Sequence, residues 1–448
     1  MRALQEVAAA LAEELRIPGV AVGLLHEGQE HHVFYGVTSV ENPLPVDERT
    51  LFLCGSTTKT FTATAIARLV EQGSVDLDAP VRTYVPEFRV EDEEAAASAT
   101  VAQLLNHTAG WDGDFFKNTG DGDDALARYV DAMAELRQLT RPGQSVSYNN
   151  ASFCVAGRLI EAVTGMTYEA ALRTLLLDPL GLEDTLFFSR DILTRRYAVG
   201  HQRLQDGGTT VQPFGIPRAS NPAGGLATTT RDLIAWARVH VEDGGSILSP
   251  ELVRRMREPT VHAPGWSSGD AVGIGWLLSD VGGLQVVGHG GAVPGQLSLF
   301  KTVPHVGFAL VACTNCFPTG SEFNDRIMRW AWETLLGTPI PEPETVARSA
   351  DEIAPLCGRY ETVANVLDVV RDGDGISIEA IDRPEILEEL GIDPEPEPPI
   401  PFLFQAGEGD RIVCVTPPHH GSTGFFVRDG GDAVTALNAF GRHAVRTG

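Results

Sequence analysis

LFLCGSTTKTFTATAIARLVEQG, residues 51–73, predicts a short extended segment, a break at Gly55 and a helix that ends at Gly73. Ser56 lies at the N-terminus of this helix. Lys59 follows three residues later, so the two side chains share one face of the helix, one turn apart. The stretch therefore predicts a strand–turn–helix unit that presents a hydroxyl and an amine side by side.

This pairing of side chains is what nucleophilic catalysis by serine requires. A serine hydroxyl attacks a carbonyl poorly unless a neighbouring base takes its proton. A lysine can be that base only when burial and its neighbours keep it neutral. Backbone N–H groups at the helix N-terminus would stabilise negative charge that develops near the serine. Ser56 and Lys59 are therefore the candidate nucleophile and base.

Lysine usage supports this interpretation, because only three of the 34 basic residues are lysines: Lys59, Lys117 and Lys301. Arginine could not replace a lysine that must lose its proton. The alternative for the tetrapeptide is an N-capping serine followed by a surface lysine. A second match to the pattern, Ser298 to Lys301, lies in an expected strand, where residues three apart point to opposite faces. We therefore reject the second match as a nucleophile–base pair.

Composition limits the classes of function. The chain has 448 residues, more than one ordinary domain, and a net charge of -26, which argues against nucleic acid or a membrane surface as partner. No apolar run has the length of a transmembrane span, and residues 1–19 lack the features of a signal peptide, so we expect a cytoplasmic protein. The six cysteines indicate reduced core residues, and the pair Cys313 and Cys316 lacks a second pair at zinc spacing. We expect no metal site.

The order of expected elements predicts the architecture. Strands near both ends of residues 1–337 surround a helical middle, which predicts one sheet built from N- and C-terminal pieces with an all-helical region inserted. Residues 338–350 are an expected linker. Residues 351–448 show short strands and turn signals, typical of a small all-β domain, a barrel or a sandwich. Within this domain Ile392–Pro401, rich in proline and glutamate, is expected to be a loop. The predicted class is α/β, more narrowly α+β.

A second motif, Tyr148-Asn149-Asn150, follows a turn and precedes an expected helix. One interpretation is a loop tyrosine followed by an N-capping asparagine. The other is a phenol that shuttles a proton, together with an amide that holds a substrate carbonyl.

A third motif, His289-Gly290-Gly291, lies between two expected strands. It is either a glycine hairpin with an exposed histidine, or an imidazole at the mouth of a cleft. In the second case a strand that begins at Ala292 could donate a backbone N–H to an oxyanion. A rival nucleophile, the Gly-x-Ser-x-Gly pattern at 265–269, lacks the strand before it and the helix after it that such an elbow needs.

The three motifs in this order resemble the β-lactamase/penicillin-binding-protein-like serine hydrolases. The branch is that of class C β-lactamases, D-alanyl-D-alanine carboxypeptidases, D-aminopeptidases and esterases, and the resemblance covers roughly residues 5–336. It implies a β-lactamase-like antiparallel sheet flanked by helices. The C-terminal domain resembles the lipocalin-like barrels of some D-aminopeptidases, and of the penicillin-binding-protein-type thioesterases that cyclise peptides.

The resemblance also implies roles for individual residues. Ser56 would attack a carbonyl while Lys59 and Tyr148 move its proton, and His289 would bind or polarise the substrate or assist Tyr148. The backbone N–H groups of Ser56 and Ala292 would hold the oxyanion. The residues implied around the substrate and the oxyanion are Asn150, Gly290, Gly291, Ala292 and Trp111. No metal or organic cofactor is implied.

The resulting hypothesis is a serine hydrolase that forms an acyl-enzyme at Ser56 and cleaves an amide, peptide or ester bond. Its partner would be a small molecule or short peptide; the oligomeric state stays open. Histidine at position 289, where β-lactamases carry lysine, favours peptidase chemistry over β-lactam hydrolysis. Asp112 or Asp114 near the cleft would favour a substrate that bears an amine. The alternatives are acyl transfer to an amine, including peptide cyclisation, and a non-catalytic binding protein.

Overall fold

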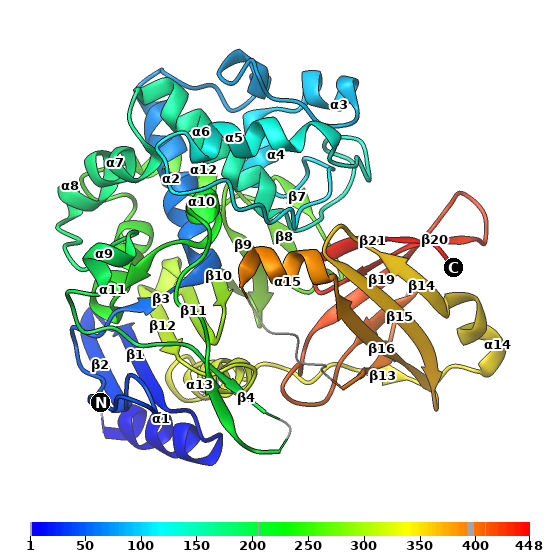
Figure 1. Cartoon of the computed structure of the whole chain (residues 1–448). Coiled ribbons are helices and arrows are strands. Elements are labelled where there is room, and N and C mark those ends of the chain that lie inside the picture. The colour runs from blue at the N-terminus through cyan, green and yellow to red at the C-terminus, as the bar shows by residue number, and fades with distance from the viewer. Residues whose placement is uncertain (1, 205, 392–397, 408) are drawn as a thin grey trace.

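The central sheet of the computed structural model is built from both ends of the first 340 or so residues (Figure 1). The structure describes residues 2–204, 206–391, 398–407 and 409–448. The sheet is antiparallel, in the order β2-β1-β12-β11-β10-β9-β8-β7. Its strands are β1 (Gly19–His26), β2 (Gln29–Gly36), β7 (Val261–His262), β8 (Ala271–Val272), β9 (Leu277–Val281), β10 (Leu284–Val293), β11 (Gln296–Val303) and β12 (Phe308–Thr314).

Helices cover both faces of this sheet, which is why β1 is a nearly unbroken apolar run. Alternate residues of β1 point to opposite faces. Val20, Val22 and Leu24 pack against α1 (Arg2–Glu14) and α13 (Thr319–Leu335). On the other face the sheet packs against α2 (Thr58–Glu71) and α11 (Thr230–Val241). The packing is close at Gly23, where a Cβ would lie 2.8 Å from the side chain of Ile234.

Many of the helices between the two halves of the sheet lie at the top of Figure 1. Two short ladders interrupt this helical region, β3 (Phe52–Leu53) with β6 (Ala227–Thr228) and β4 (His201–Arg203) with β5 (Thr209–Val211). Its helices besides α2 and α11 are α3 (Glu93–Ser98), α4 (Val101–Leu105), α5 (Ala125–Ala132), α6 (Asn150–Thr164), α7 (Tyr168–Leu172), α8 (Asp178–Leu180), α9 (Ser189–Ile192), α10 (Asn221–Gly224) and α12 (Pro250–Met256). Sheet and helical insertion together confirm the predicted fold class.

The C-terminal residues form a barrel, which decides between the two all-β forms that the sequence left open. Eight strands, β14 to β21, pair in order around it, and the pairing of β17 with β18 closes the ring. Tyr360, Ile378 and Leu437 are among the side chains that fill its interior. Its strands are β14 (Gly358–Glu361), β15 (Asn365–Asp372), β16 (Gly375–Asp382), β17 (Ile400–Gln405), β18 (Arg411–Val413), β19 (Thr423–Arg428), β20 (Val434–Ala439) and β21 (Arg442–Arg446).

The segments around the barrel carry some regular structure. In the expected linker, β13 (Thr345–Val346) pairs with β17, and the short helix α14 (Ala350–Ile353) follows. A further helix, α15 (Pro384–Leu390), precedes the expected proline-rich loop, of which residues 392–397 lie outside the described part of the chain. The exact domain boundaries stay predictions. In the described parts of the chain, every helix is too short or too polar to span a bilayer.

The barrel touches the helical region through the turn between β20 and β21. The backbone N–H of Tyr148 donates to Gly441 O at 2.8 Å, and the Ser147 hydroxyl accepts from the His443 N–H at 3.1 Å. The side-chain amide of Asn438 donates to Val146 O at 3.2 Å. The segment that leads into α6 is therefore held by the last hairpin of the barrel.

Candidate active site

Ser56 lies in a single 3-10 turn, η1 (Gly55–Thr57), between strand β3 and helix α2. This confirms the predicted strand–turn–helix unit. Gly55 has a φ of +51°, and a Cβ there would lie 2.7 Å from the backbone nitrogen of Ala292. Only glycine combines that backbone conformation with so close an approach. Helix α2 is buried along nearly all of its length, so the turn rests on a rigid support.

Lys59 is fully buried and its amine contacts three oxygen atoms. The Nζ atom lies 3.0 Å from Ser56 Oγ, 2.6 Å from Asn150 Oδ1 and 2.6 Å from Ala223 O. Burial lowers the pKa of Lys59 to about 7, and the positive charge of Arg442 acts in the same direction. A neutral amine has two N–H groups and one lone pair. It can therefore donate to Asn150 and Ala223 while it accepts the proton of Ser56.

Tyr148 places its phenol beside the nucleophile. Its ring lies 5.0 Å from Lys59 Nζ and stacks on the imidazole of His107, with 4.4 Å between the ring centroids. Burial raises the pKa of Tyr148, and a hydrogen bond with the Ser56 hydroxyl opposes this only in part. The side chain is therefore a neutral phenol at physiological pH. Such a group can pass a proton on without carrying a charge itself.

The two asparagines of the second motif have different partners. Asn149 caps α6, because its Oδ1 accepts from Ser152 N at 2.8 Å. The Oδ1 of Asn150 accepts from Lys59, and its Nδ2 donates to Asp114 Oδ1 at 2.6 Å. Both ends of the Asn150 amide are thus engaged inside the protein. A contact of Asn150 with substrate stays a prediction.

His289 lies within β10, opposite Phe300, and not in a turn. The expected glycine turn is wrong, because the chain reverses at Pro294 and Gly295 instead. The imidazole is 2% exposed, its Nδ1 lies 2.5 Å from Gly290 O, and its Nε2 is buried with no partner among the described residues. Burial lowers the pKa of His289 to about 3, so the ring is neutral. Its centroid is 6.0 Å from that of the Tyr148 ring.

Gly291 lets β10 pass directly beside the Ser56 turn. A Cβ at Gly291 would lie 1.9 Å from Cys54 O and 2.8 Å from Ser56 N. The hydroxyl of Ser298, in the rejected second Ser-x-x-Lys match, donates to Cys54 O at 2.7 Å and so ties the turn to β11. The backbone of β10 at Ala292 and that of the Ser56 turn are therefore neighbours, as a pair of oxyanion donors requires.

Three other expected residues, Trp111, Asp112 and Asp114, have their own partners inside the protein. The indole of Trp111 is fully buried against Phe88, with 5.2 Å between the ring centroids, and its carbonyl accepts from the Asn149 side chain at 2.8 Å. Its contact with substrate stays a prediction. Asp112 bonds to Arg137 and to the backbone of the barrel, and Asp114 bonds to Arg442. Because both carboxylates are paired, the basis for expecting an amine-bearing substrate is removed.

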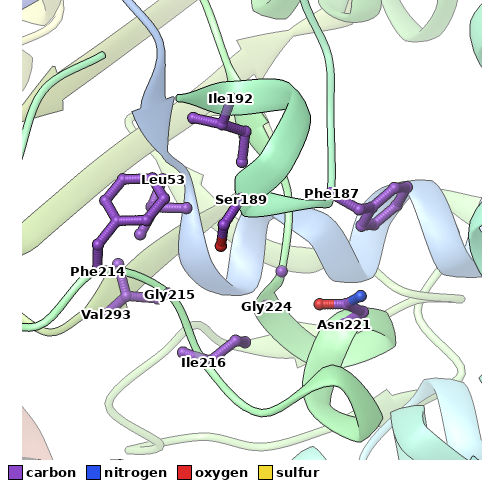
Figure 2. Close-up of a pocket in the computed structure, with 11 residues that line it drawn as sticks. Leu53, Phe187, Ser189, Ile192, Phe214, Gly215, Ile216, Asn221, Gly224 and Val293 are labelled. Carbon is purple, nitrogen blue, oxygen red and sulfur yellow. The ribbon is translucent and has the colours of Figure 1, made fainter. Parts of the chain in front are cut away.

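A small cavity opens beside the nucleophile turn (Figure 2). Its empty space is about 320 Å³, the open mouth included. Gly224 borders it and also packs against Gly55, since a Cβ at Gly224 would lie 3.6 Å from the Gly55 carbonyl carbon. Several of its lining side chains are apolar, but the surface that faces the cavity is more polar than apolar; the lining residues are Leu53, Phe187, Ser189, Ile192, Phe214, Gly215, Ile216, Asn221, Gly224, Gly225 and Val293. In the described residues, no group of three or more His, Cys, Asp or Glu side chains is placed to hold a metal ion.

Three comparisons connect this site to known proteins. The family model described as Beta-lactamase matches residues 4–352. Penicillin-binding protein 4 of Amycolatopsis lactamdurans is 35% identical over 377 residues, which are 80% of this chain and 96% of that protein. The crystal structure of SurE superposes with a TM-score of 0.77 at 26% identity and covers 100% of this chain and 99% of SurE. D-amino acid amidase from Ochrobactrum anthropi SV3 superposes with a TM-score of 0.61 at 26% identity, over 73% of this chain and 95% of the amidase.

Proposed function

The chain belongs to the Beta-lactamase family, and from this premise we propose that it is a serine hydrolase that forms an acyl-enzyme at Ser56. The substrate is a small amide, peptide or ester. The observation that carries the proposal is the distance of 3.0 Å between the Ser56 hydroxyl oxygen and the amine of Lys59, whose pKa burial lowers to about 7. A buried base of this kind next to a serine is the signature of an activated nucleophile.

In the proposed acylation step, Ser56 Oγ attacks the carbonyl carbon and its proton passes to Lys59. The new C–O bond turns the carbonyl oxygen into an oxyanion, which the backbone N–H groups of Ser56 and Ala292 hold. The proton then moves through the Tyr148 phenol to the leaving amine or alcohol as its bond to carbon breaks. Water attacks the ester in the second step, Lys59 takes its proton, and Ser56 recovers a hydrogen when the acyl group leaves.

The cavity bordered by Gly224, which packs against Gly55, is the space that we assign to the side chain of the substrate's acyl part. Its lining includes Phe187, Phe214 and Ile216, which suit an apolar side chain, beside polar groups such as Asn221. Two relatives favour a D-configured residue at the bond: one is a D-amino acid amidase, and SurE has been solved with D-Leu. The preferred substrates are therefore derivatives of apolar D-amino acids.

Acyl transfer to an amine is the second candidate, because the C-terminal barrel resembles the extra domains of penicillin-binding-protein-type thioesterases that cyclise peptides. The chain resembles SurE over its whole length, barrel included, while the amidase covers 73% of the chain. If an amine replaces water in the second step, the product is a new amide, linear or cyclic. Product analysis with and without an added amine separates hydrolysis from transfer.

Covalent labelling tests the proposed function directly. A fluorophosphonate or a β-lactam should add one equivalent of mass to the intact protein, and peptide mapping should place it on Ser56. A panel of p-nitrophenyl esters, D- and L-amino-acid anilides and nitrocefin then ranks the substrates. Absence of both labelling and turnover would favour the non-catalytic binding protein.

The pKa of Lys59 predicts an acid limb in the pH profile. The active form is the neutral amine, so kcat/KM should rise with pH and level off above about pH 8. With a pKa of about 7, the value should be about a tenth of the plateau at pH 6 and about a hundredth at pH 5. Measurements of ester hydrolysis from pH 5 to 9 check this. A flat profile over that range would contradict Lys59 as the base.

The cavity predicts a change in side-chain preference on substitution of Ile216. The larger ring in Ile216→Trp should fill the space and lower kcat/KM about 10- to 100-fold for leucine or phenylalanine derivatives, while alanine derivatives change little. Ile216→Leu, of equal volume, is the matched control. Steady-state kinetics on the two substrate sizes measures the effect. An equal loss for both sizes would mean that the side chain does not enter the cavity.

A further inference from the structure

One side chain of the C-terminal barrel, that of Arg442, contacts residues of the candidate active site. Arg442 begins β21, and its Nε lies 2.8 Å from Asp114 Oδ2, with a second contact of 3.5 Å from Nη2 to Oδ1. The Asp114 side chain is 8% exposed and that of Arg442 is 32% exposed. A carboxylate this deeply buried is costly without a partner, and Arg442 supplies that partner.

Asp114 also receives the amide of Asn150, and this contact fixes which way the amide points. An asparagine amide has a donor end and an acceptor end of nearly equal shape. A carboxylate only accepts, so it selects the Nδ2 end, at 2.6 Å. The Oδ1 end is then turned to Lys59 Nζ, also at 2.6 Å. The opposite orientation would set the N–H groups of Asn150 against those of Lys59.

The contacts form one chain from the barrel to the nucleophile: Arg442, Asp114, Asn150, Lys59 and Ser56. We propose that Arg442 is a positioning residue of the proposed hydrolase, which acts through Asp114 and Asn150 to hold the amine of Lys59 in line with Ser56. The inference rests on the proposed function. It makes the barrel part of the catalytic apparatus and not only an added domain.

Two further contacts support a role for this turn of the barrel. The guanidinium of Arg442 lies 4.6 Å from the centroid of the Tyr148 ring, and Gly441 O accepts from the Tyr148 backbone. Burial is the main cause of the lowered pKa of Lys59, and the charges of Arg442, which lowers it, and Asp114, which raises it, act in opposite directions. Three other titratable groups interact electrostatically with Lys59. Cys154 raises the pKa of Lys59, and the charge of Lys59 lowers the pKa values of His107 and His289.

The test compares Arg442→Ala with Arg446→Ala in the full-length chain. Arg446 lies on the same strand but donates to Pro355 O and Cys357 O inside the barrel, so it is a matched control for folding. Arg442→Ala should lower kcat about 10- to 100-fold with KM changed less than about threefold. Guanidinium ion at low concentration should restore part of the rate, and Arg442→Lys should be intermediate. Arg446→Ala should keep the wild-type kinetics.

A second readout does not depend on turnover. Because the chain has only three lysines, lysine labelled with ¹³C at Cε gives three signals, and loss of one in Lys59→Arg assigns it. In Arg442→Ala the unpaired Asp114 should raise the pKa of Lys59 by about one unit, and Asp114→Asn added to it should reverse the shift.

The outcomes separate the inference from the proposed function. Unchanged kcat and an unchanged Lys59 titration in Arg442→Ala would overturn the inference while Ser56 labelling still stands. A loss confined to KM would overturn it too, because Arg442 would then bind substrate directly. If the wild type is neither labelled nor active, the proposed function fails, and with it the positioning role in hydrolysis, whatever the lysine titration shows.

Discussion

Ser56→Ala is expected to lower kcat/KM for p-nitrophenyl esters by at least about 10⁴-fold and to abolish labelling by a fluorophosphonate. The reason is that the variant removes the only atom of the proposed mechanism that bonds to the substrate. Removal of a serine nucleophile costs about as much as removal of the whole catalytic unit, which leaves only binding and the oxyanion donors. The residual rate should be that of direct attack by water on a substrate held by the binding site and the oxyanion donors.

Ser267→Ala is the control for this substitution. Ser267 is the serine of the Gly-x-Ser-x-Gly pattern, and it lies in the turn between β7 and β8. A nucleophile elbow leads directly into a helix, whereas the chain after Ser267 continues into strand β8. Ser267→Ala should keep full activity and full labelling. If Ser56→Ala were still labelled and the label mapped to another serine, Ser56 would not be the nucleophile.

Lys59→Arg is expected to lower kcat about 10³-fold or more, even though a positive group with N–H donors remains. A guanidinium does not lose its proton in the physiological range, so the base is removed while the charge is kept. The buried site around Nζ is also closed by Asn150 Oδ1 and Ala223 O at 2.6 Å, which leaves little room for a larger group. The pH profile should lose its acid limb near pH 7 together with the rate.

Lys301→Arg is the matched control, because Lys301 belongs to the second Ser-x-x-Lys match and lies on strand β11. Its kinetics should equal those of the wild type. Circular dichroism and thermal melting check that both variants are folded. Lys59→Arg with more than about a tenth of the wild-type kcat would show that a neutral amine is not required.

The sequence predicts best what lies close together in the chain. Ser56 and Lys59 share one helix, so their spacing alone brings them to one face, and the structure places the amine against the hydroxyl. Tyr148, Asn150 and His289 come from distant segments. Their convergence followed from the resemblance of ordered motifs, since no local pattern fixes the distance between segments so far apart.

Three parts of the site lie beyond sequence reasoning. Arg442 belongs to another domain, and nothing near it in the chain marks it as a partner of Asp114. The glycines after His289 favour a turn, which is their commonest use, whereas in the structure Gly291 allows β10 to pass against the Ser56 turn. The carbonyl of Ala223 was also missed, because a backbone oxygen has no signature in a side-chain pattern.

The pairing of β1 with β12 has a consequence for how the protein is made. Val20 must find Thr314, almost a whole domain further along. At about 5–20 residues per second, a ribosome needs tens of seconds to deliver that partner. Until then β1 on the nascent chain can pair only with β2, and its other edge, which pairs with β12 in the folded protein, stays unpaired. Yield in a heterologous host should therefore respond to chaperone supply and to slower growth at low temperature.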